Sequence, residues 1–394
     1  MFKNYRITDD IFYVGVNDRQ KVKFENLIPL TKGVSYNSYL IIDEKIALID
    51  AVDISFADVY MDKINAQLNG RKPDYVIVNH TEPDHSGALR VLMAHFPDMC
   101  IVGNKKTLDI LNGFYRIAYN TLEVADGDTL SLGNHELQFY LTPMVHWPET
   151  MMTFDKSAKI LFSGDAFGSF GALNGALIDE DMNIDGYWDE LILYYANIVG
   201  KYGSPVQKAL EKVGGLPFEI ICSTHGPVWK KYLKETVGLY DRLSRYEGEK
   251  GIVIVYGSMY GNTALMAETV AQGAGQAGVK NIIVHNASLT DSSVILRDIF
   301  KYKGLIIGSP TYSNELYPEI DAIVRKIAIR GIKNRVFGYF GSFTWAGASV
   351  KRLASFAETM KWEPVLTPVE EKQGLKEEKY NACLELGAKV AGLL

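Results

Sequence analysis

Cysteine is scarce in this sequence, and its spacing excludes several classes of protein. The chain has three cysteines among 394 residues, Cys100, Cys222 and Cys383. No two of them form a C-x-x-C pair, which excludes a disulfide scaffold, a zinc ribbon and an attached iron centre with cysteine ligands.

Long apolar runs and excess basic charge are also missing. No uninterrupted apolar stretch approaches the roughly 18 residues of a membrane span, and the start, "MFKNYRITDDIFYVGV", has no apolar targeting segment. We therefore expect a cytoplasmic protein that does not bind membranes. Its 41 basic and 47 acidic residues give a net charge of −6 without a basic run, so we expect no nucleic-acid partner either.

The length of the chain and its alternation of apolar runs with helical segments predict two α/β domains. Short β-branched runs alternate with turns and helical stretches in the first part, which indicates a layered α/β domain over residues 1–249. A polar segment, "YEGEK", then precedes a second domain over residues 250–394. Five apolar runs in that domain, separated by helical segments, predict a doubly wound five-stranded parallel sheet. These runs are 251–258, 281–288, 304–312, 334–343 and 362–369.

Side chains of the metal-ligand type end four apolar runs of the first domain. The stretch "VNHTEPDHSGALR" places two histidines and two carboxylates in six consecutive positions, and three further residues each follow another apolar run. Because strand ends meet at one edge of an α/β sheet, this pattern predicts a metal site. The candidate ligands are His80, Glu82, Asp84, His85, His146, Asp165 and His225.

Seven ligands are too many for one tetrahedral ion. They suit two metals that share a bridging carboxylate, and the centrally placed Asp165 is the best candidate for the bridge. Three carboxylates and four imidazoles form an oxygen-rich set, which favours iron or manganese and leaves zinc open.

Three loops of the second domain predict a flavin site. The loop "GSMYGNTA" opens a helix with hydroxyls and backbone N–H groups, and it lacks both the lysine of a P-loop and a G-x-G-x-x-G pattern. A phosphate monoester such as that of FMN fits it. Two later loops add small polar residues and the aromatic rings of Tyr312 and Trp345, which suit an isoalloxazine ring. The candidate residues are Ser258, Met259, Tyr260, Gly261, Asn262, Thr263, Pro310, Thr311, Tyr312, Ser313, Asn314, Ser342, Phe343, Thr344, Trp345, Ala346 and Gly347.

The ligand pattern resembles a known superfamily. His-x-Glu-x-Asp-His at residues 80–85, followed at long range by a His, an Asp and a His, is similar to the His-x-His-x-Asp-His signature of metallo-β-lactamases. Glu82 stands where those hydrolases carry a histidine, and this substitution is typical of the flavodiiron proteins, also called A-type flavoproteins. The resemblance extends over almost the whole chain, because that family joins a metallo-β-lactamase-like αβ/βα sandwich to a flavodoxin-like domain.

This resemblance implies a diiron site. One iron would be bound by His80, Glu82 and His146, and the other by Asp84, His85 and His225, with Asp165 as the bridge. In some members of the family, the histidine that matches His85 turns away from the metal. Tyr195 matches a tyrosine near the diiron pocket and is the expected catalytic side chain.

The resemblance further implies a reductase of O2 and/or NO. Electrons would pass from a small rubredoxin-type carrier through FMN to two irons per chain, and these would reduce O2 to water and/or NO to N2O. The family also implies a head-to-tail homodimer, or a dimer of such dimers. Two alternatives stay open: a binuclear zinc hydrolase with a flavodoxin-like regulatory module, and an electron-transfer flavoprotein whose metal domain is only structural.

Overall fold

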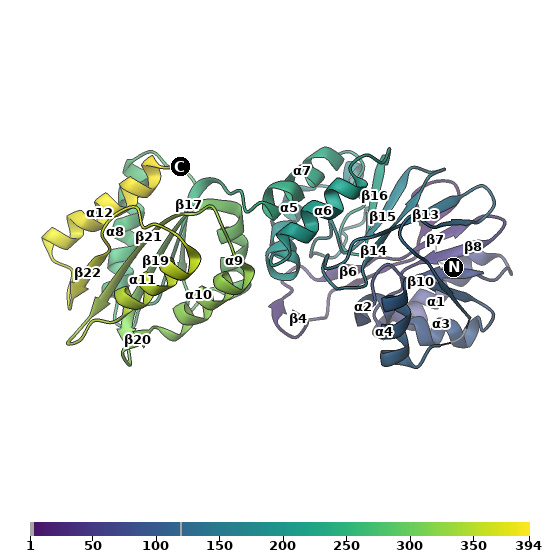
Figure 1. Cartoon of the computed structure of the whole chain (residues 1–394), viewed down its shortest axis with the longest axis horizontal. Coiled ribbons are helices and arrows are strands. Elements are labelled where there is room, and N and C mark those ends of the chain that lie inside the picture. Colours follow the sequence, from purple (N-terminus) through teal and green to yellow (C-terminus); the bar gives the residue numbers. More distant parts are fainter. Residues whose placement is uncertain (1–3, 119) are drawn as a thin grey trace. The chain divides into compact units, whose positions relative to one another are not determined.

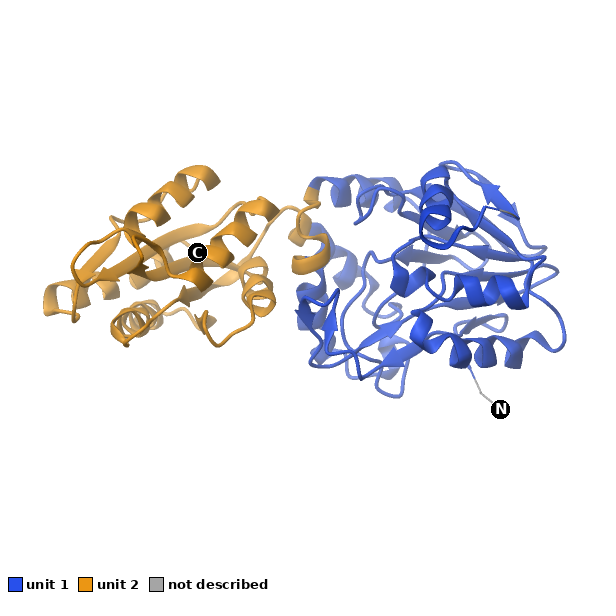
Figure 2. Ribbon diagram, turned by 90° about the horizontal axis from the view of Figure 1, so that it is seen from below, with its two compact units in different colours: residues 1–195, 204–241 blue, residues 196–203, 242–394 orange. Residues whose placement is uncertain are grey.

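The chain divides into two compact units. The structure, a computed structural model, describes residues 4–118 and 120–394 (Figure 1). One unit contains residues 1–195 and 204–241, and the other contains residues 196–203 and 242–394 (Figure 2). The domain boundary between residues 249 and 250 stays a prediction.

The first sheet of the first unit has seven strands in the order β1-β2-β7-β8-β9-β10-β11. Strands β8 to β11 run parallel, and the other neighbours pair antiparallel. The bounds are β1 Tyr5–Arg6, β2 Ile11–Tyr13, β7 Tyr39–Ile42, β8 Ile46–Ile49, β9 Tyr75–Ile77, β10 Cys100–Gly103 and β11 Thr121–Glu123.

The second sheet of this unit has five strands in the order β12-β13-β14-β15-β16, and only β15 and β16 run parallel. The bounds are β12 Thr129–Ser131, β13 Glu136–Leu141, β14 Met151–Asp155, β15 Ile160–Gly164 and β16 Ile220–Ser223. Two small antiparallel pairs stand apart from both sheets. They are β3 Val16–Asp18 with β6 Val34–Tyr36, and β4 Lys23–Phe24 with β5 Ile28–Pro29.

The two sheets face each other across one apolar core. Alternate residues of their strands, such as Tyr39 and Ile41 of the first sheet and Leu137 and Phe139 of the second, join a single buried cluster. This period of two is expected of strands that bury one face. Two groups of helices lie on either side of the strands, completing an αβ/βα sandwich (Figure 1). They are α1 Ala57–Leu68, α3 Leu89–His95 and α4 Lys105–Tyr115, and α5 Asp185–Tyr194, α6 Gly203–Val213 and α7 Leu233–Ser244.

The second unit contains the predicted five-stranded parallel sheet, in the order β18-β17-β19-β21-β22. A short strand, β20, pairs antiparallel with the end of β19. The strand bounds are β17 Glu249–Tyr256, β18 Ile282–Asn286, β19 Tyr302–Tyr312, β20 Glu315–Leu316, β21 Val336–Phe343 and β22 Val369–Lys372. The helices are α8 Asn262–Gln276, α9 Ser292–Lys301, α10 Pro318–Arg330, α11 Ser349–Met360 and α12 Glu377–Gly392.

The fifth strand starts later than its apolar run predicts. Proline has no backbone N–H to give to a sheet ladder, and Pro364 and Pro368 both fall within that run. Only an isolated bridge joins Pro364 to Phe337 of β21, and continuous pairing begins at Val369. Trp362 packs its ring against Phe337 at a centroid distance of 5.3 Å.

Glycines allow α8 and α12 to pack closely against each other. A Cβ atom at Gly273 would lie 2.1 Å from the carbonyl oxygen of Leu384, and one at Gly387 would lie 2.0 Å from that of Val270. No larger residue fits at either contact. Among the residues that the structure describes, no helix is both long and apolar enough to cross a lipid bilayer.

Candidate functional site

Loops at the ends of four strands bring the seven predicted ligands together. Each loop follows a strand of one of the two sheets, so its backbone is held by the sheet while its side chains point beyond it. All seven side chains are buried. His80 and Glu82 follow β9, Asp84 and His85 lie in the short helix α2 Pro83–Ser86, His146 lies between β13 and β14, Asp165 follows β15, and His225 follows β16.

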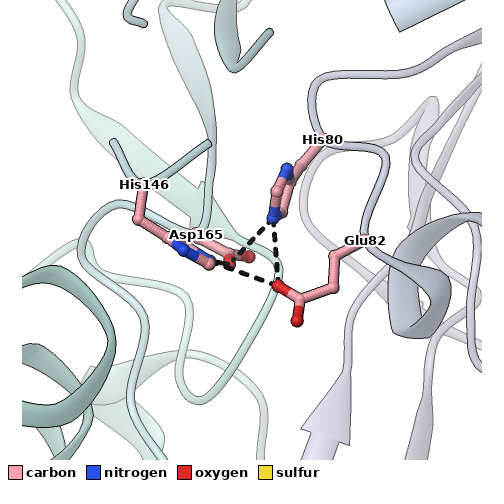
Figure 3. A group of neighbouring side chains, drawn as sticks. All are labelled: His80, Glu82, His146 and Asp165. Carbon is pink, nitrogen blue, oxygen red and sulfur yellow. Dashed lines mark hydrogen bonds and ion pairs between the residues drawn. The ribbon is translucent and has the colours of Figure 1, made fainter. Parts of the chain in front are cut away.

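The first ligand group consists of His80, Glu82, His146 and Asp165 (Figure 3). Nε2 of His146 lies 3.2 Å from Oε2 of Glu82 and 3.2 Å from Oδ2 of Asp165. Nε2 of His80 lies 3.3 Å from the same Glu82 oxygen and 3.5 Å from the same Asp165 oxygen. Four donor atoms that face one another at these distances form a set that can hold one metal ion.

The second ligand group consists of Asp84, His85 and His225. The Nε2 atoms of the two histidines lie 3.0 Å apart, and each lies 3.4 Å from Oδ2 of Asp84. Both carboxylate oxygens of Asp84 are buried, and within the described part of the chain neither has a hydrogen-bond donor. Buried oxygens of this kind are costly unless a cation or a donor satisfies them, so they fit a metal ion.

Asp165 is shared between the two groups. Its Oδ2 atom faces the first group, whereas its Oδ1 atom lies 3.1 Å from Nε2 of His85 and 3.9 Å from Nε2 of His225. Thr224 donates a hydrogen bond from Oγ1 to Oδ1 over 2.5 Å, which fixes the rotation of the carboxylate. A carboxylate that bridges two metals presents one oxygen to each of them, and Asp165 presents one oxygen to each ligand group.

The charges of the site are strongly coupled. Burial acts to raise the pKa of Asp165, but the charges of His85 and His80 outweigh it and hold that pKa well below its usual range. Burial raises the pKa of Asp84 to about 7, whereas Asp84 and Asp165 overcome the burial of His85 and raise its pKa to about 9. Imidazolium protons therefore balance the carboxylates when no metal is bound, and metal ions can replace those protons.

Hydrogen bonds from Nδ1, the ring nitrogen that points away from the ligand groups, orient His80 and His225. The acceptors of these bonds were not predicted from the sequence. Nδ1 of His80 donates to Oε1 of Glu149 over 2.9 Å, and Nδ1 of His225 donates to the carbonyl oxygen of Ser35 over 2.7 Å. Each bond leaves Nε2 free to face the site. The only sequence signal for Glu149 is its closeness to His146, and nothing in the sequence marks a backbone carbonyl at residue 35.

His85 lacks such an anchor. Its Nδ1 atom is buried without a hydrogen-bond partner among residues 4–118 and 120–394. The ring packs edge-on against His225 at a centroid distance of 4.5 Å. His85 therefore faces the site with less support than His80 and His225.

Two adjacent tyrosines of α5 and the turn after it lie near the site. The ring of Tyr194 lies 5.4 Å from that of His225, and burial together with the charge of Asp165 raises the pKa of Tyr194 well above its ordinary value. The ring of Tyr195 packs edge-on against Tyr240 at 5.0 Å. A catalytic role for Tyr195 stays a prediction. Of the two tyrosines, Tyr194 is the one whose ring contacts a candidate metal ligand, His225.

The three predicted loops of the second unit surround one cavity of about 410 Å³ and a smaller polar pocket beside it. The loops follow β17, β19 and β21, at the carboxyl ends of neighbouring parallel strands. Of the 17 predicted residues, only Gly261 and Gly347 do not line either hollow. Gly261 adopts a φ of +97° at the start of α8, a conformation that favours glycine.

Hydroxyl groups and exposed aromatic rings line these hollows. The Oγ atom of Ser258 accepts hydrogen bonds from the backbone N–H groups of Gly261 and Ala264, and Thr263 and Ser342 join their hydroxyls over 2.9 Å. Tyr260 is 92% exposed and Trp345 is 86% exposed, although both line the cavity. Neutral donors at a helix start with aromatic faces nearby fit a phosphate and a flat ring system.

Comparisons with known proteins agree with both halves of the chain. The family described as ODP family beta lactamase matches residues 34–226, and the flavodoxin family matches residues 254–387. The anaerobic nitric oxide reductase flavorubredoxin of Escherichia coli O1:K1 is 32% identical over 391 residues, which cover 98% of this chain and 81% of that protein. Its counterpart in Salmonella choleraesuis strain SC-B67 is 33% identical over 92% of this chain and 79% of that one.

Solved structures resemble the whole chain. The rubredoxin oxygen:oxidoreductase of Desulfovibrio gigas has a TM-score of 0.94 at 28% identity, with 99% of this chain and 98% of that chain covered. The flavodiiron protein of Giardia intestinalis has a TM-score of 0.92 at 27% identity, with coverage of 100% and 98%. The chain belongs to the flavodiiron protein family. As a flavodiiron protein, it combines the metallo-β-lactamase-like fold and the flavodoxin-like fold predicted from its sequence.

Proposed function

We propose that this flavodiiron protein is an oxidoreductase that reduces O2 to water, NO to N2O, or both, with electrons from a separate small carrier. The observation that carries the proposal is Asp165, whose two carboxylate oxygens face two separate groups of metal ligands. The names of the relatives support both gases, because the E. coli protein is a nitric oxide reductase and the D. gigas protein is an oxygen oxidoreductase.

Two iron ions and one FMN per chain are the cofactors of the proposed reaction. The irons would lie between the ligands of the two groups, and FMN would occupy the cavity between the loops that contain Tyr260, Thr311 and Trp345. When bound, the reduced irons supply one electron each and the reduced flavin supplies two, which matches the four electrons needed to convert O2 to water.

The side chains of the chain itself prepare the site for small neutral gases. Glu149 and the carbonyl of Ser35 hold His80 and His225 with Nε2 toward the metals. Glu82 gives the first ligand group an anionic oxygen ligand. A third histidine at this position would be a neutral and softer ligand. Burial of all seven ligands keeps bulk water away, so that the charges of the site act at low dielectric.

We further propose a rubredoxin-type carrier as the electron donor, a head-to-tail homodimer or a dimer of such dimers as the assembly, and the cytoplasm as the location. The D. gigas protein is named for its rubredoxin partner, which supports a donor of that type here. The three cysteines without a C-x-x-C pair support a donor on a separate chain.

The experiment that tests the function is gas consumption by the iron- and FMN-loaded protein. Reduced rubredoxin is mixed anaerobically with the protein, and O2 or NO is followed with an electrode while N2O is measured by gas chromatography. We expect consumption of at least one gas by the wild type and none by Asp165→Ala, which should retain FMN. Asp126→Ala is the matched control, because Asp126 is half exposed, belongs to neither ligand group and pairs with Lys212.

A binuclear zinc hydrolase is the alternative that this experiment also decides. Hydrolysis needs no electrons, so a protein that consumes neither gas but cleaves esters or lactams with zinc bound would support it. An electron-transfer flavoprotein with a structural metal would instead consume no gas, and Asp165→Ala would exchange electrons with rubredoxin at the wild-type rate.

A further inference from the structure

A small hairpin lies against the second ligand group. Strands β4 and β5 pair only with each other and belong to neither main sheet. Phe24, at the end of β4, is 2% exposed, as is its cross-strand partner Ile28 at 3%, whereas the adjacent Lys23 and Glu25 are exposed. Its ring stands edge-on to that of His225, with centroids 5.6 Å apart and an interplanar angle of 83°.

Phe24 belongs to an aromatic wall beside His225. Its ring lies 5.2 Å from Phe170 and 6.5 Å from Tyr194, and the ring of Tyr194 also contacts His225. These contacts leave the second ligand group with an apolar side. An apolar wall favours neutral diatomic gases over water and limits how many atoms fit beside the metals.

The hairpin is attached by a few contacts that do not involve the sheets. Nζ of Lys21 donates to the hydroxyl of Tyr36 over 3.0 Å and pairs with Oδ2 of Asp53 at 3.2 Å. The ammonium group also lies 5.9 Å from the centre of the Phe24 ring. Because Phe24 enters the site from a separate element, its truncation changes the wall and leaves the ligand loops in place.

The two proposed reactions require different amounts of space. Reduction of O2 follows O2 + 4e⁻ + 4H⁺ → 2H2O and admits one diatomic molecule. Reduction of NO follows 2NO + 2e⁻ + 2H⁺ → N2O + H2O, so two molecules must approach each other to form the N–N bond. In both cases the carrier supplies the electrons and water supplies the protons.

We propose that Phe24 sets the ratio of O2 to NO reduction by limiting the space beside His225. This proposal rests on the proposed function and assigns a selectivity residue to its site. With the phenyl ring present, the wall favours a single diatomic molecule. With the ring removed, a second molecule has room to enter, so NO reduction gains relative to O2 reduction.

The test compares Phe24→Ala and Phe24→Leu with Val22→Ala in the full iron- and FMN-loaded chain. Val22 is the matched control because it lies in the same hairpin and is 76% exposed. The first readout is kcat/KM for each gas with the same reduced rubredoxin. The second is the azide affinity of the oxidised protein from its visible spectrum, because azide is a triatomic anion longer than either gas.

The proposal expects Phe24→Ala to raise the NO-to-O2 ratio of kcat/KM about tenfold, as a change of pocket size in other enzymes does. Azide should bind about tenfold more tightly, with Phe24→Leu between the wild type and Phe24→Ala and with Val22→Ala unchanged. An unchanged ratio and an unchanged azide affinity in both Phe24 variants, at full iron content, would overturn the role of Phe24.

The two readouts separate this proposal from the proposed function. A wild type that consumes neither gas would refute the function, and azide binding would still test the wall. If Phe24→Ala fails to fold, Phe24→Leu decides the proposal, since a leucine fills the core position and leaves part of the space empty.

Discussion

Nδ1 of His80 donates a hydrogen bond of 2.9 Å to Oε1 of Glu149, and both side chains are buried. The same oxygen accepts hydrogen bonds from the backbone N–H and the hydroxyl of Thr81. Burial acts to raise the pKa of Glu149, but the bond from His80 outweighs it and lowers that pKa, so the carboxylate stays ionised at neutral pH. This contact fixes the tautomer of His80 with Nε2 toward the site.

The Glu149→Gln variant should bind iron more weakly, by about 10- to 100-fold, because a neutral amide holds the histidine less firmly and makes it less basic. Iron retained against a series of chelators measures the change. Glu136→Gln is the control, since Glu136 is half exposed and pairs with Lys156. Equal retention by Glu149→Gln and the wild type would show that this contact does not support the metal.

Substitution of His85 should cost less iron than substitution of His225. Nδ1 of His225 is held by the carbonyl of Ser35, whereas Nδ1 of His85 has no partner in the described part of the chain. We expect His85→Ala to keep most of its iron and His225→Ala to lose at least the second ion. Elemental analysis of both variants, purified side by side, measures this order. Equal iron loss, or greater loss in His85→Ala, would mean that the bond from His225 to the Ser35 carbonyl does not set this order.

The seven candidate ligands could be picked out from the sequence because each is a polar side chain that follows an apolar run, and the structure brings these side chains together in two groups. It does not predict which oxygen of Asp165 faces which group, because that depends on the packing of four separate loops. Glu149 and Ser35 were missed for the same reason, since their roles arise from contacts between residues far apart in the chain. The later start of β22 shows the opposite case, in which two prolines in the sequence outweigh an apolar pattern.

Trp345→Ala should weaken FMN binding by about tenfold. The indole ring is 86% exposed and lines the cavity, so its loss removes a stacking face without disturbing a core. An aromatic stacking pair contributes about 1 kcal/mol beyond its buried area, and a tenfold change corresponds to about 1.4 kcal/mol. Fluorescence titration of the apoprotein with FMN measures the affinity.

Leu289→Ala is the matched control for Trp345→Ala. Leu289 is 84% exposed in another loop of the second unit and lines neither hollow. Unchanged FMN affinity in Trp345→Ala would remove this ring from the flavin site.

The stability of the first unit should fall as the pH rises from about 6.5 to about 9. Nδ1 of His135 donates to Asp155 over 2.6 Å and Nε2 lies 3.0 Å from Asp10. The bond to Asp155 is the main cause that raises the pKa of His135 from 6.5 to about 9. Because the folded protein holds this proton more tightly than the unfolded chain, the stabilisation is complete below pH 6.5 and is lost as the pH rises through 9.

The His135→Gln variant should lack this dependence. Urea midpoints of the wild type and the variant, measured between about pH 6 and about pH 9.5, should differ most at the acidic end and converge at the alkaline end. A difference that stays constant across this range would mean that His135 stabilises the fold without its charge.

The most direct test of the account is the metal and flavin content of the protein purified without oxygen. Elemental analysis and the identity of the released flavin give both quantities from one preparation. We expect two irons and one FMN per chain in the wild type, and Asp165→Ala should lose the metal and retain the flavin. Zinc as the native metal, with no activity restored by iron, would contradict this expectation.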